Sequence, residues 1–377
     1  MALKHIKFDC RYFDGSKPCL FKRACRGCKS YEPMNKPRGE KILIIKLASM
    51  GDVLRTTAIL PALKEKYPQS HISWLVDGRA EELLRDNPFI DRVVAYGSDK
   101  ASALQAERFE TVISLDKAAG AAACGTLIRA RKKFGFGLNE RGKIFPLNKE
   151  AEYAFLLGID DHLKFRKNEL TYQQLIFEIC DLKYKGERYG LSVGRKEKQL
   201  AEAFFKKNRL RADSLTVGIN TGSGRVFANK NLSPGKIIAL IKLLREELHA
   251  QILLLGGPLE RGINKHIAGK VDFKVTDSGC GHSLKEFAGI INKCSLVISG
   301  DTLGLHLAIA LERPVVALFG PTCSQEIDLY GMGIKIISGI KCAPCYKNKC
   351  DKNFNCMDSI DLEEIVNSVK QLMGRRF

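Results

Sequence analysis

The sequence predicts an α/β protein with two doubly wound units in tandem. Short apolar runs rich in β-branched residues recur along the chain, as expected of parallel strands that are buried on both faces. Segments with helical spacing separate these runs, and such alternation is typical of doubly wound sheets. The chain has 377 residues, of which 45% are hydrophobic and 27% charged. This length suits two or three domains, and the composition excludes disorder over most of the chain.

The first unit begins with the run KILIIKL at Lys41–Leu47, which predicts a buried strand. A turn at Ala48–Gly51 leads into helical spacing over Asp52–Tyr67, where Pro61 should kink or interrupt the helix. The other elements predicted here are strands at His71–Val76, Arg92–Ala95 and Thr111–Leu115, and a helix at Ala80–Asp86.

The second unit follows a charged stretch around Gly194–Lys198. Its predicted strands are Leu215–Asn220, Gln251–Leu255, Leu296–Ser299 and Val315–Leu318. Its predicted helices are Lys198–Lys207, Pro234–Leu248, Leu284–Ile291, Leu303–Leu311 and Leu362–Met373. We therefore expect a cysteine-rich segment at 1–38, one α/β domain at 39–194 and a second at 195–377.

The chain carries 61 basic and 42 acidic residues, a formal charge of +19. Such an excess favours an anionic partner, which is nucleic acid, a membrane face or a phosphorylated substrate, although it also serves solubility. Arg129, Arg131, Lys132 and Lys133 form a dense basic patch, which would hold the phosphates of a phosphorylated substrate and an anionic membrane surface; the alternative is a solvated helix end. No apolar run approaches the roughly 20 residues of a membrane span. The charged N-terminus lacks a signal-peptide core, so we expect a cytoplasmic protein.

Ligands of doubly wound sheets bind outside the carboxyl ends of the strands, and four candidate sites follow predicted strands. The first is Gly51-Asp52, where the carboxylate can accept a proton from a substrate hydroxyl. Asp is also a favoured helix N-cap, which is the structural alternative. The second is the loop containing Thr221, Gly222 and Ser223, whose backbone N–H groups can surround phosphate oxygens. Lys230 follows it and can neutralise a diphosphate; an ordinary turn is the alternative.

The third site is the loop after Gln251–Leu255. Gly257 allows a ligand or a helix to approach the backbone closely, and Glu260 can accept hydrogen bonds from ribose hydroxyls. An ordinary strand-to-helix loop is the alternative. The fourth joins a strand to a helix, whose N-terminus favours an anion. Its candidate residues are Asp301, Thr302, Gly304 and His306.

Eight of the thirteen cysteines form two clusters that can bind metal. The C-terminal cluster is Cys342, Cys345, Cys350 and Cys356, and the N-terminal cluster is Cys10, Cys19, Cys25 and Cys28. Four thiolates favour a tetrahedral zinc or iron site, or an iron–sulfur cluster, over disulfides in the cytosol. Reduced cysteines in loops are the alternative. The scattered Cys124, Cys180, Cys280, Cys294 and Cys323 are interpreted as small core residues.

From Lys41 to Met373 the chain resembles glycosyltransferase family 9, the ADP-heptose:lipopolysaccharide heptosyltransferases. The resemblance rests on KILIIKLASMGDVLRTTAILPALKEKYP, LLLGGPLE and SGDTLGLHLAIALERPVVALFGPT. It implies the GT-B fold, in which two Rossmann-like domains face a cleft, with the donor mainly in the C-terminal domain and the acceptor mainly in the N-terminal one. It also implies an ADP-heptose-like donor, a lipopolysaccharide-core acceptor, an inverting transfer without a catalytic metal, and work next to the inner membrane.

The resemblance assigns roles to the four sites. Asp52 would be the general base, and Lys230 would stabilise the leaving diphosphate. Thr302, Gly304 and His306 would line the phosphate pocket, with Glu260 on the ribose. Two positions depart from the family: Leu303 stands where a glycine is usual, and Leu259 precedes Glu260 where an acid is frequent. Some protein-modifying relatives carry cysteine-bound iron in a C-terminal finger, which the C-terminal cluster resembles.

Two other functions fit parts of the sequence. One is a glycosyltransferase of the same fold that acts on protein or another glycan. The other is a nucleic-acid-binding protein with metal knuckles, which the charge and the clustered cysteines favour. Against it, the chain has no recognisable helix-turn-helix, and its glycines follow strands. We therefore do not expect nucleic acid as a partner.

Overall fold

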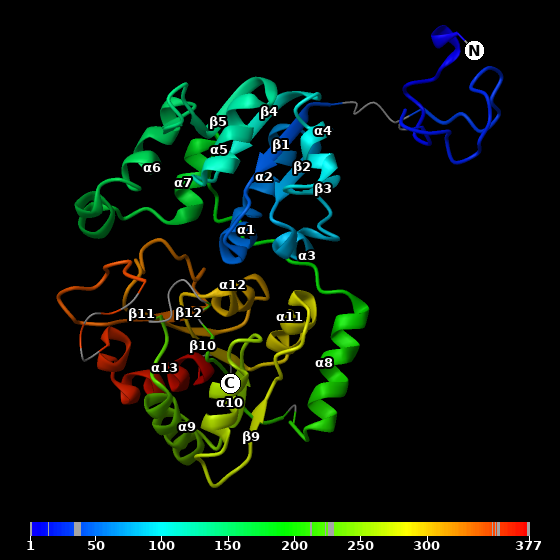
Figure 1. Cartoon of the computed structure of the whole chain (residues 1–377). Helices are drawn as coiled ribbons and strands as arrows, with labels where there is room; N and C mark the ends of the chain where they lie inside the picture. The colour runs from blue at the N-terminus through cyan, green and yellow to red at the C-terminus, as the bar shows by residue number, and fades with distance from the viewer. Residues whose placement is uncertain are drawn as a thin grey trace.

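The structure is a computed structural model that describes residues 2–13, 15–33, 39–211, 213–222, 224, 230–348, 350, 352 and 355–374. It contains two six-stranded sheets, each within its own α/β unit. Figure 1 shows one unit above the other and the N-terminal segment as a separate lobe. The predicted tandem of doubly wound units is confirmed.

The first sheet has the strand order β3-β2-β1-β4-β5-β6. Its strands are β1 Lys41–Ile45, β2 His71–Val76, β3 Arg92–Ala95, β4 Arg108–Ser114, β5 Arg129–Leu138 and β6 Ile144–Pro146. Its helices are α1 Met50–Thr56, α2 Ile59–Lys66, α3 Glu81–Leu84, α4 Asp99–Ala103, α5 Ala119–Leu127, α6 Glu152–Leu156 and α7 Tyr172–Ile179. Only the β5–β6 pair is antiparallel. The run of β1 is central, with Ile44 opposite Trp74 and Ile113, all buried.

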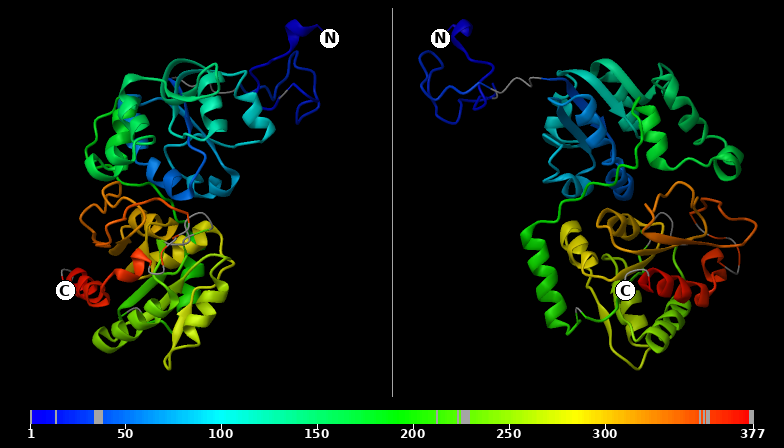
Figure 2. Two further views of the ribbon diagram at one scale, coloured as in Figure 1. Left: turned by 60° about the vertical axis from the view of Figure 1, so that its left-hand side comes forward. Right: turned by 180° about the vertical axis from the view of Figure 1, so that it is seen from behind.

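The second sheet is parallel throughout, in the order β12-β11-β10-β7-β8-β9. Its strands are β7 Thr216–Asn220, β8 Gln251–Leu255, β9 Val275–Asp277, β10 Leu296–Gly300, β11 Val315–Phe319 and β12 Gly333–Ile337. Its helices are α8 Arg195–Lys207, α9 Pro234–Leu248, α10 Arg261–Ala268, α11 Leu284–Asn292, α12 Leu303–Ala310 and α13 Leu362–Gly374. Figure 2 shows helices on both faces of this sheet.

The single helix predicted over Asp52–Tyr67 is divided into α1 and α2 at Thr57 and Ala58. The Thr57 hydroxyl donates to the carbonyl of Leu54 and accepts from the backbone N–H of Gly190, which lies between the two units. Pro61 lies in the first turn of α2, where its missing N–H breaks no helical hydrogen bond. The predicted interruption is confirmed, and it precedes the proline.

The two units pack against each other through α1 and α3 of the first and α12 and α11 of the second. One apolar cluster includes Val53 of α1 and Leu305 of α12, and so it continues across the boundary. Glu82 of α3 accepts hydrogen bonds from the hydroxyl of Ser283 (2.6 Å) and the N–H of Leu284 (3.0 Å) at the start of α11. The carboxyl ends of both central strands therefore approach the same boundary.

The N-terminal lobe has little apolar core. Its described residues contain one short 3-10 turn at Leu3–His5 and an isolated bridge between Cys10 and Pro33. Cys10 is the only buried apolar side chain among them. A segment of this size needs another source of stability, such as a metal, disulfides or a partner.

Candidate active site

Asp52 lies in the first turn of α1, directly after the turn that follows β1. Ser49 is the N-cap and Asp52 the third helical residue, so the alternative that Asp52 is itself the N-cap is wrong. The backbone N–H and the hydroxyl of Ser49 donate to Oδ2 of Asp52 at 3.2 and 3.1 Å. These bonds orient the carboxylate, of which 28% remains exposed.

Two cations flank the Asp52 carboxylate. Nη2 of Arg55 lies 2.6 Å from Oδ1, and Nζ of Lys46 lies 3.9 Å from Oδ2. Burial by itself would raise the pKa of Asp52, but the charges of Arg55, Lys46 and His306 outweigh it and hold the pKa far below its ordinary value. Asp52 is therefore ionised at neutral pH, as a proton acceptor must be.

Asp116, which follows β4, is a site residue that the sequence reasoning missed. Its carboxylate accepts from the N–H groups of Leu47 (3.1 Å) and Ala48 (3.2 Å) and lies 3.7 Å from Nζ of Lys46. It therefore fixes the turn that carries Asp52 and shares the lysine with it. The available signal was an acid directly after a predicted strand.

The opposite side of the site is the turn between β10 and α12. The carboxylate of Asp301 lies 3.1 Å from Nζ of Lys230 and 3.5 Å from Nε2 of His306. Burial would raise the pKa of Asp301, but the hydrogen bond from His306 and the charge of Lys230 lower it well below its usual range. Thr302 is the N-cap of α12, so the N–H groups of the first helical turn lie at this point. This turn can bind an anion.

Gly304 allows α12 to lie close to the end of β7. A Cβ at Gly304 would lie 2.8 Å from Cγ of Asn220, a distance that real Cβ atoms essentially never show. Nδ2 of Asn220 donates to the hydroxyl of Thr302 at 2.8 Å and orients it. Leu303, where the resemblance predicts a glycine, begins α12 and packs against the main apolar cluster.

The second and third candidate sites meet at Glu260, whose Oε2 accepts from the N–H of Gly257 at 2.8 Å. A Cβ at Gly222 would lie 2.9 Å from the Glu260 carboxyl carbon, so this glycine permits the contact. The hydroxyl of Thr221 is buried and is within hydrogen-bonding distance of Leu255 O and Asn264 Oδ1, so it supports the loop from inside. Ser223 lies outside the described residues.

Asp52 and the turn between β10 and α12 lie next to each other across the boundary between the two units. A Cβ at Gly51 would overlap the imidazole ring of His306, so α1 and α12 touch beside Asp52. Nδ1 of His306 lies 3.4 Å from the hydroxyl of Tyr189, and its Nε2 faces Asp301. Tyr189 lies between the two units and orients the histidine; no sequence pattern indicated it.

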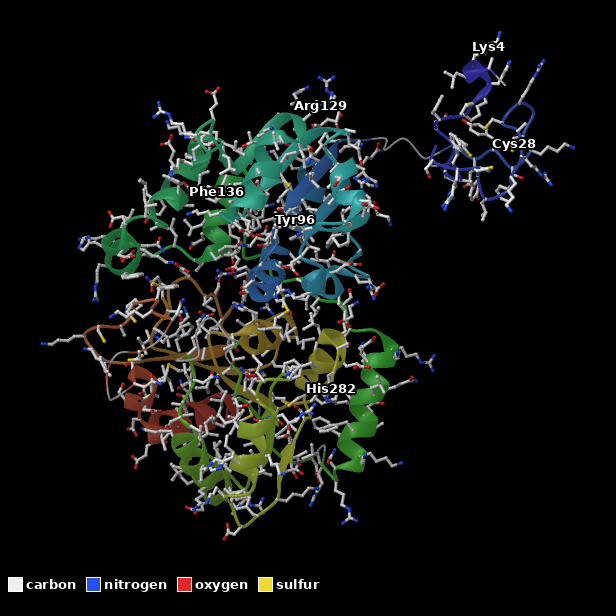
Figure 3. All side chains as sticks on the ribbon, viewed as in Figure 1. Lys4, Cys28, Tyr96, Arg129, Phe136 and His282 are labelled. Atoms are coloured by element: carbon white, nitrogen blue, oxygen red, sulfur yellow. The ribbon has the colours of Figure 1, made fainter. Side chains whose placement is uncertain are left out.

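The basic patch that we expected to hold acceptor phosphates lies elsewhere. Arg129, Arg131, Lys132 and Lys133 occupy the first half of strand β5, not a helix end, and are at the amino edge of the parallel sheet. Figure 3 shows Arg129 on the side of the unit away from the boundary with the second unit. Lys117, at the carboxyl edge, is closer to the site; burial and then the charge of Lys164 lower its pKa to about 8.

The two cysteine clusters do not form a ready metal site. Cys10, Cys19, Cys25 and Cys28 line one small cavity in the N-terminal lobe. In the C-terminal cluster, burial and then the neighbouring Cys345, Cys350 and Cys342 raise the pKa of Cys356 to about 11. All eight thiols are free, and across the described part of the chain no three Cys, His, Asp or Glu side chains are positioned to hold an ion.

The family model of glycosyltransferase family 9 (heptosyltransferase) matches residues 100–354, about two thirds of the chain. The chain belongs to glycosyltransferase family 9. This family 9 chain is 28% identical to lipopolysaccharide heptosyltransferase 1 of Campylobacter coli over 351 residues, which span 89% of this chain and 99% of the relative. Within the described ranges, no helix is both long and apolar enough to cross a bilayer.

Solved structures support the GT-B fold of the family 9 chain. A family 9 glycosyltransferase from Veillonella parvula superposes with a TM-score of 0.72 at 18% identity, over 89% of this chain and 98% of that one. The ADP-heptose lps heptosyltransferase II of E. coli superposes with a TM-score of 0.64 at 18% identity, over 89% of this chain and 99% of that one. The iron-containing dodecameric glycosyltransferase TibC of enterotoxigenic E. coli superposes with a TM-score of 0.54 at 14% identity, over 92% of this chain and 79% of that one.

Proposed function

We propose that this family 9 glycosyltransferase transfers a heptose from ADP-heptose to an inner-core lipopolysaccharide acceptor, with inversion at the anomeric carbon. The observation that carries the proposal is the contact of α1 with α12, which places a partly buried, ionised carboxylate beside a helix start that can bind an anion. The Campylobacter relative and the E. coli neighbour, whose names state heptosyl transfer and ADP-heptose, supply the identity of the sugar.

In the proposed reaction, Asp52 accepts the proton of the acceptor hydroxyl while the acceptor oxygen attacks the anomeric carbon. The bond from that carbon to the diphosphate breaks, and ADP leaves with its electron pair. Lys230, Thr302 and the first N–H groups of α12 would bind the phosphates, because negative charge grows there. Gly222, Gly257 and Glu260 would hold the ribose.

A donor screen tests this function. The protein is incubated with ADP-heptose, ADP-glucose or UDP-glucose and with heptose-free core lipopolysaccharide, and the product is weighed by mass spectrometry. We expect the mass of one heptose to be added from ADP-heptose alone. Transfer of another sugar, or transfer to protein and not to the core, would favour the alternative glycosyltransferase.

The nucleic-acid alternative is tested by thermal unfolding with ADP or duplex DNA. A specific ligand of the folded state raises the melting temperature, so we expect a shift with ADP. A shift with DNA alone that moderate salt removes would contradict the enzyme assignment.

We further propose that the cysteine clusters hold structural zinc or iron. The shared cavity of the N-terminal thiols and the small apolar core of that lobe support the first site. The proximity of the four C-terminal thiols supports the second, and the neighbour TibC is iron-containing. The thiols would have to draw closer together around the ion, deprotonated as thiolates.

Elemental analysis of protein purified without chelator is expected to find about one metal ion per occupied cluster. Cys28→Ser should remove the metal of the N-terminal lobe, whereas Cys124→Ser, outside both clusters, should leave the metal content unchanged. Fresh, reduced wild-type protein without metal would contradict the proposal.

We also propose that the enzyme works on the cytoplasmic side of the inner membrane. The exposed basic residues of β5 would contact anionic lipid there, on the edge of the sheet opposite the active site.

A further inference from the structure

Arg55 is a buried cation whose hydrogen-bonding capacity is not fully used. Only 9% of the residue is exposed. Its guanidinium carbon lies 3.7 Å from the ring centroid of Tyr172, and Nη2 holds Oδ1 of Asp52 at 2.6 Å. Its Nε is buried and has no hydrogen-bond partner among the described residues. A buried, unpaired donor is costly unless a ligand completes it.

The guanidinium of Arg55 also acts on the second unit. Its charge contributes to the lowered pKa of Asp301, in the turn proposed to bind the diphosphate. The ring of Tyr172 packs against the Arg55 guanidinium. The backbone N–H of Tyr172 donates to the carbonyl of Glu326 at 3.0 Å, and this hydrogen bond crosses the boundary between the two units. Arg55 is therefore fixed against the carboxylate of Asp52, with its charge felt at Asp301 in the second unit.

The proposed transfer moves one negative charge across this gap. The proton of the acceptor hydroxyl goes to Asp52, which becomes neutral, and the electron pair of the broken carbon–oxygen bond goes to the diphosphate. A cation fixed between the two has an anionic partner before and after the step.

We propose that Arg55 is a further catalytic residue, which orients Asp52 before transfer and binds the leaving diphosphate afterwards. This inference rests on the proposed function. It also explains how a strongly stabilised carboxylate can act as a base. A diphosphate that competes for the guanidinium weakens its hold on Asp52, so the carboxylate becomes a better proton acceptor when donor is bound.

Arg55 is not the only charged group near Asp52. Lys46, at the end of β1, faces it together with its partner Asp116, and His306 faces it from α12. Replacement of Arg55 removes none of these groups. A change in pH dependence can therefore be assigned to the guanidinium.

The test compares wild type, Arg55→Met and Arg55→Lys, with Arg79→Met as the control because Arg79 forms an exposed ion pair with Asp77. For Arg55→Met we expect kcat to fall about 100-fold or more and ADP to bind about tenfold more weakly by calorimetry. Because removal of the cation raises the pKa of Asp52, the loss of kcat/KM at low pH should begin at a higher pH. Arg55→Lys should retain part of the kcat and part of the ADP affinity that Arg55→Met loses. Arg79→Met should match wild type in both.

A folded Arg55→Met protein with wild-type ADP affinity and an unchanged pH profile would overturn the proposal, even if its melting temperature falls. A wild type that binds ADP but transfers no heptose would instead contradict the proposed function. In that case the ADP affinities of the variants still decide whether Arg55 contacts the diphosphate.

Discussion

Asp52→Asn is expected to lower the rate of heptosyl transfer by about 10³-fold, because the amide cannot accept the proton of the acceptor hydroxyl. Affinity for ADP should not fall, since Lys230, Thr302 and the first N–H groups of α12 lie on the second unit and the substitution keeps Arg55. Asparagine keeps the side-chain volume and can still accept from Ser49. Steady-state kinetics and calorimetry with ADP provide the two measurements.

Stability must be checked in the same variant, because the substitution leaves Arg55 without its ionic partner. We expect a loss of about 2–3 kcal/mol in the free energy of unfolding, less than for a fully buried pair because part of Asp52 is exposed. Asp213→Asn is the control, since Asp213 forms an exposed pair with Arg211. Transfer by folded Asp52→Asn at nearly the wild-type rate would show that another group is the base.

Gly51→Ala is expected to lower kcat about 100-fold by forcing α1 and α12 apart. The new methyl group would overlap the ring of His306, so either the histidine moves or the two units separate. A displacement of about 1 Å at a reacting centre is enough for an effect of this size. Steady-state kinetics should show the loss of kcat.

Alanine is a better helix former than glycine by about 1 kcal/mol, so the helix itself is not weakened by Gly51→Ala. Gly262→Ala is the matched control, because Gly262 lies in α10 with no atom within 4 Å of the added Cβ. Full activity of Gly51→Ala would mean that the two units do not need this contact for catalysis.

The central strands and the helices beside them could be predicted because each has a clear hydrophobic period. β1 and β8 are nearly continuous apolar runs, and both were expected at positions close to those observed. β5 was missed because its first half, RARKK, carries the charges of an exposed edge and hides the strand pattern. The patch was therefore not recognised as part of a strand, and the alternative placed it at a helix end.

The candidate site was predictable where its residues follow strands and unpredictable where it depends on the packing of the two units. Asp52 and Asp301 are both close to the carboxyl ends of strands, where ligands of such sheets bind, so both could be predicted as site residues. Arg55 lies three residues after Asp52 on the same helix face, a signal that the sequence offered. Tyr189 comes from an irregular connection, and only the folded chain shows that it meets His306.

Glu82 has a further consequence for turnover. It belongs to the first unit but accepts hydrogen bonds from the first N–H groups of α11 in the second unit, so separation of the units would leave those N–H groups to bond with water. Lys285 is also only 4% exposed and donates to Asp86 at 2.7 Å across the same boundary. Separation of the two units for ADP release would break these bonds, and we therefore expect release of ADP to be slower than the chemical step.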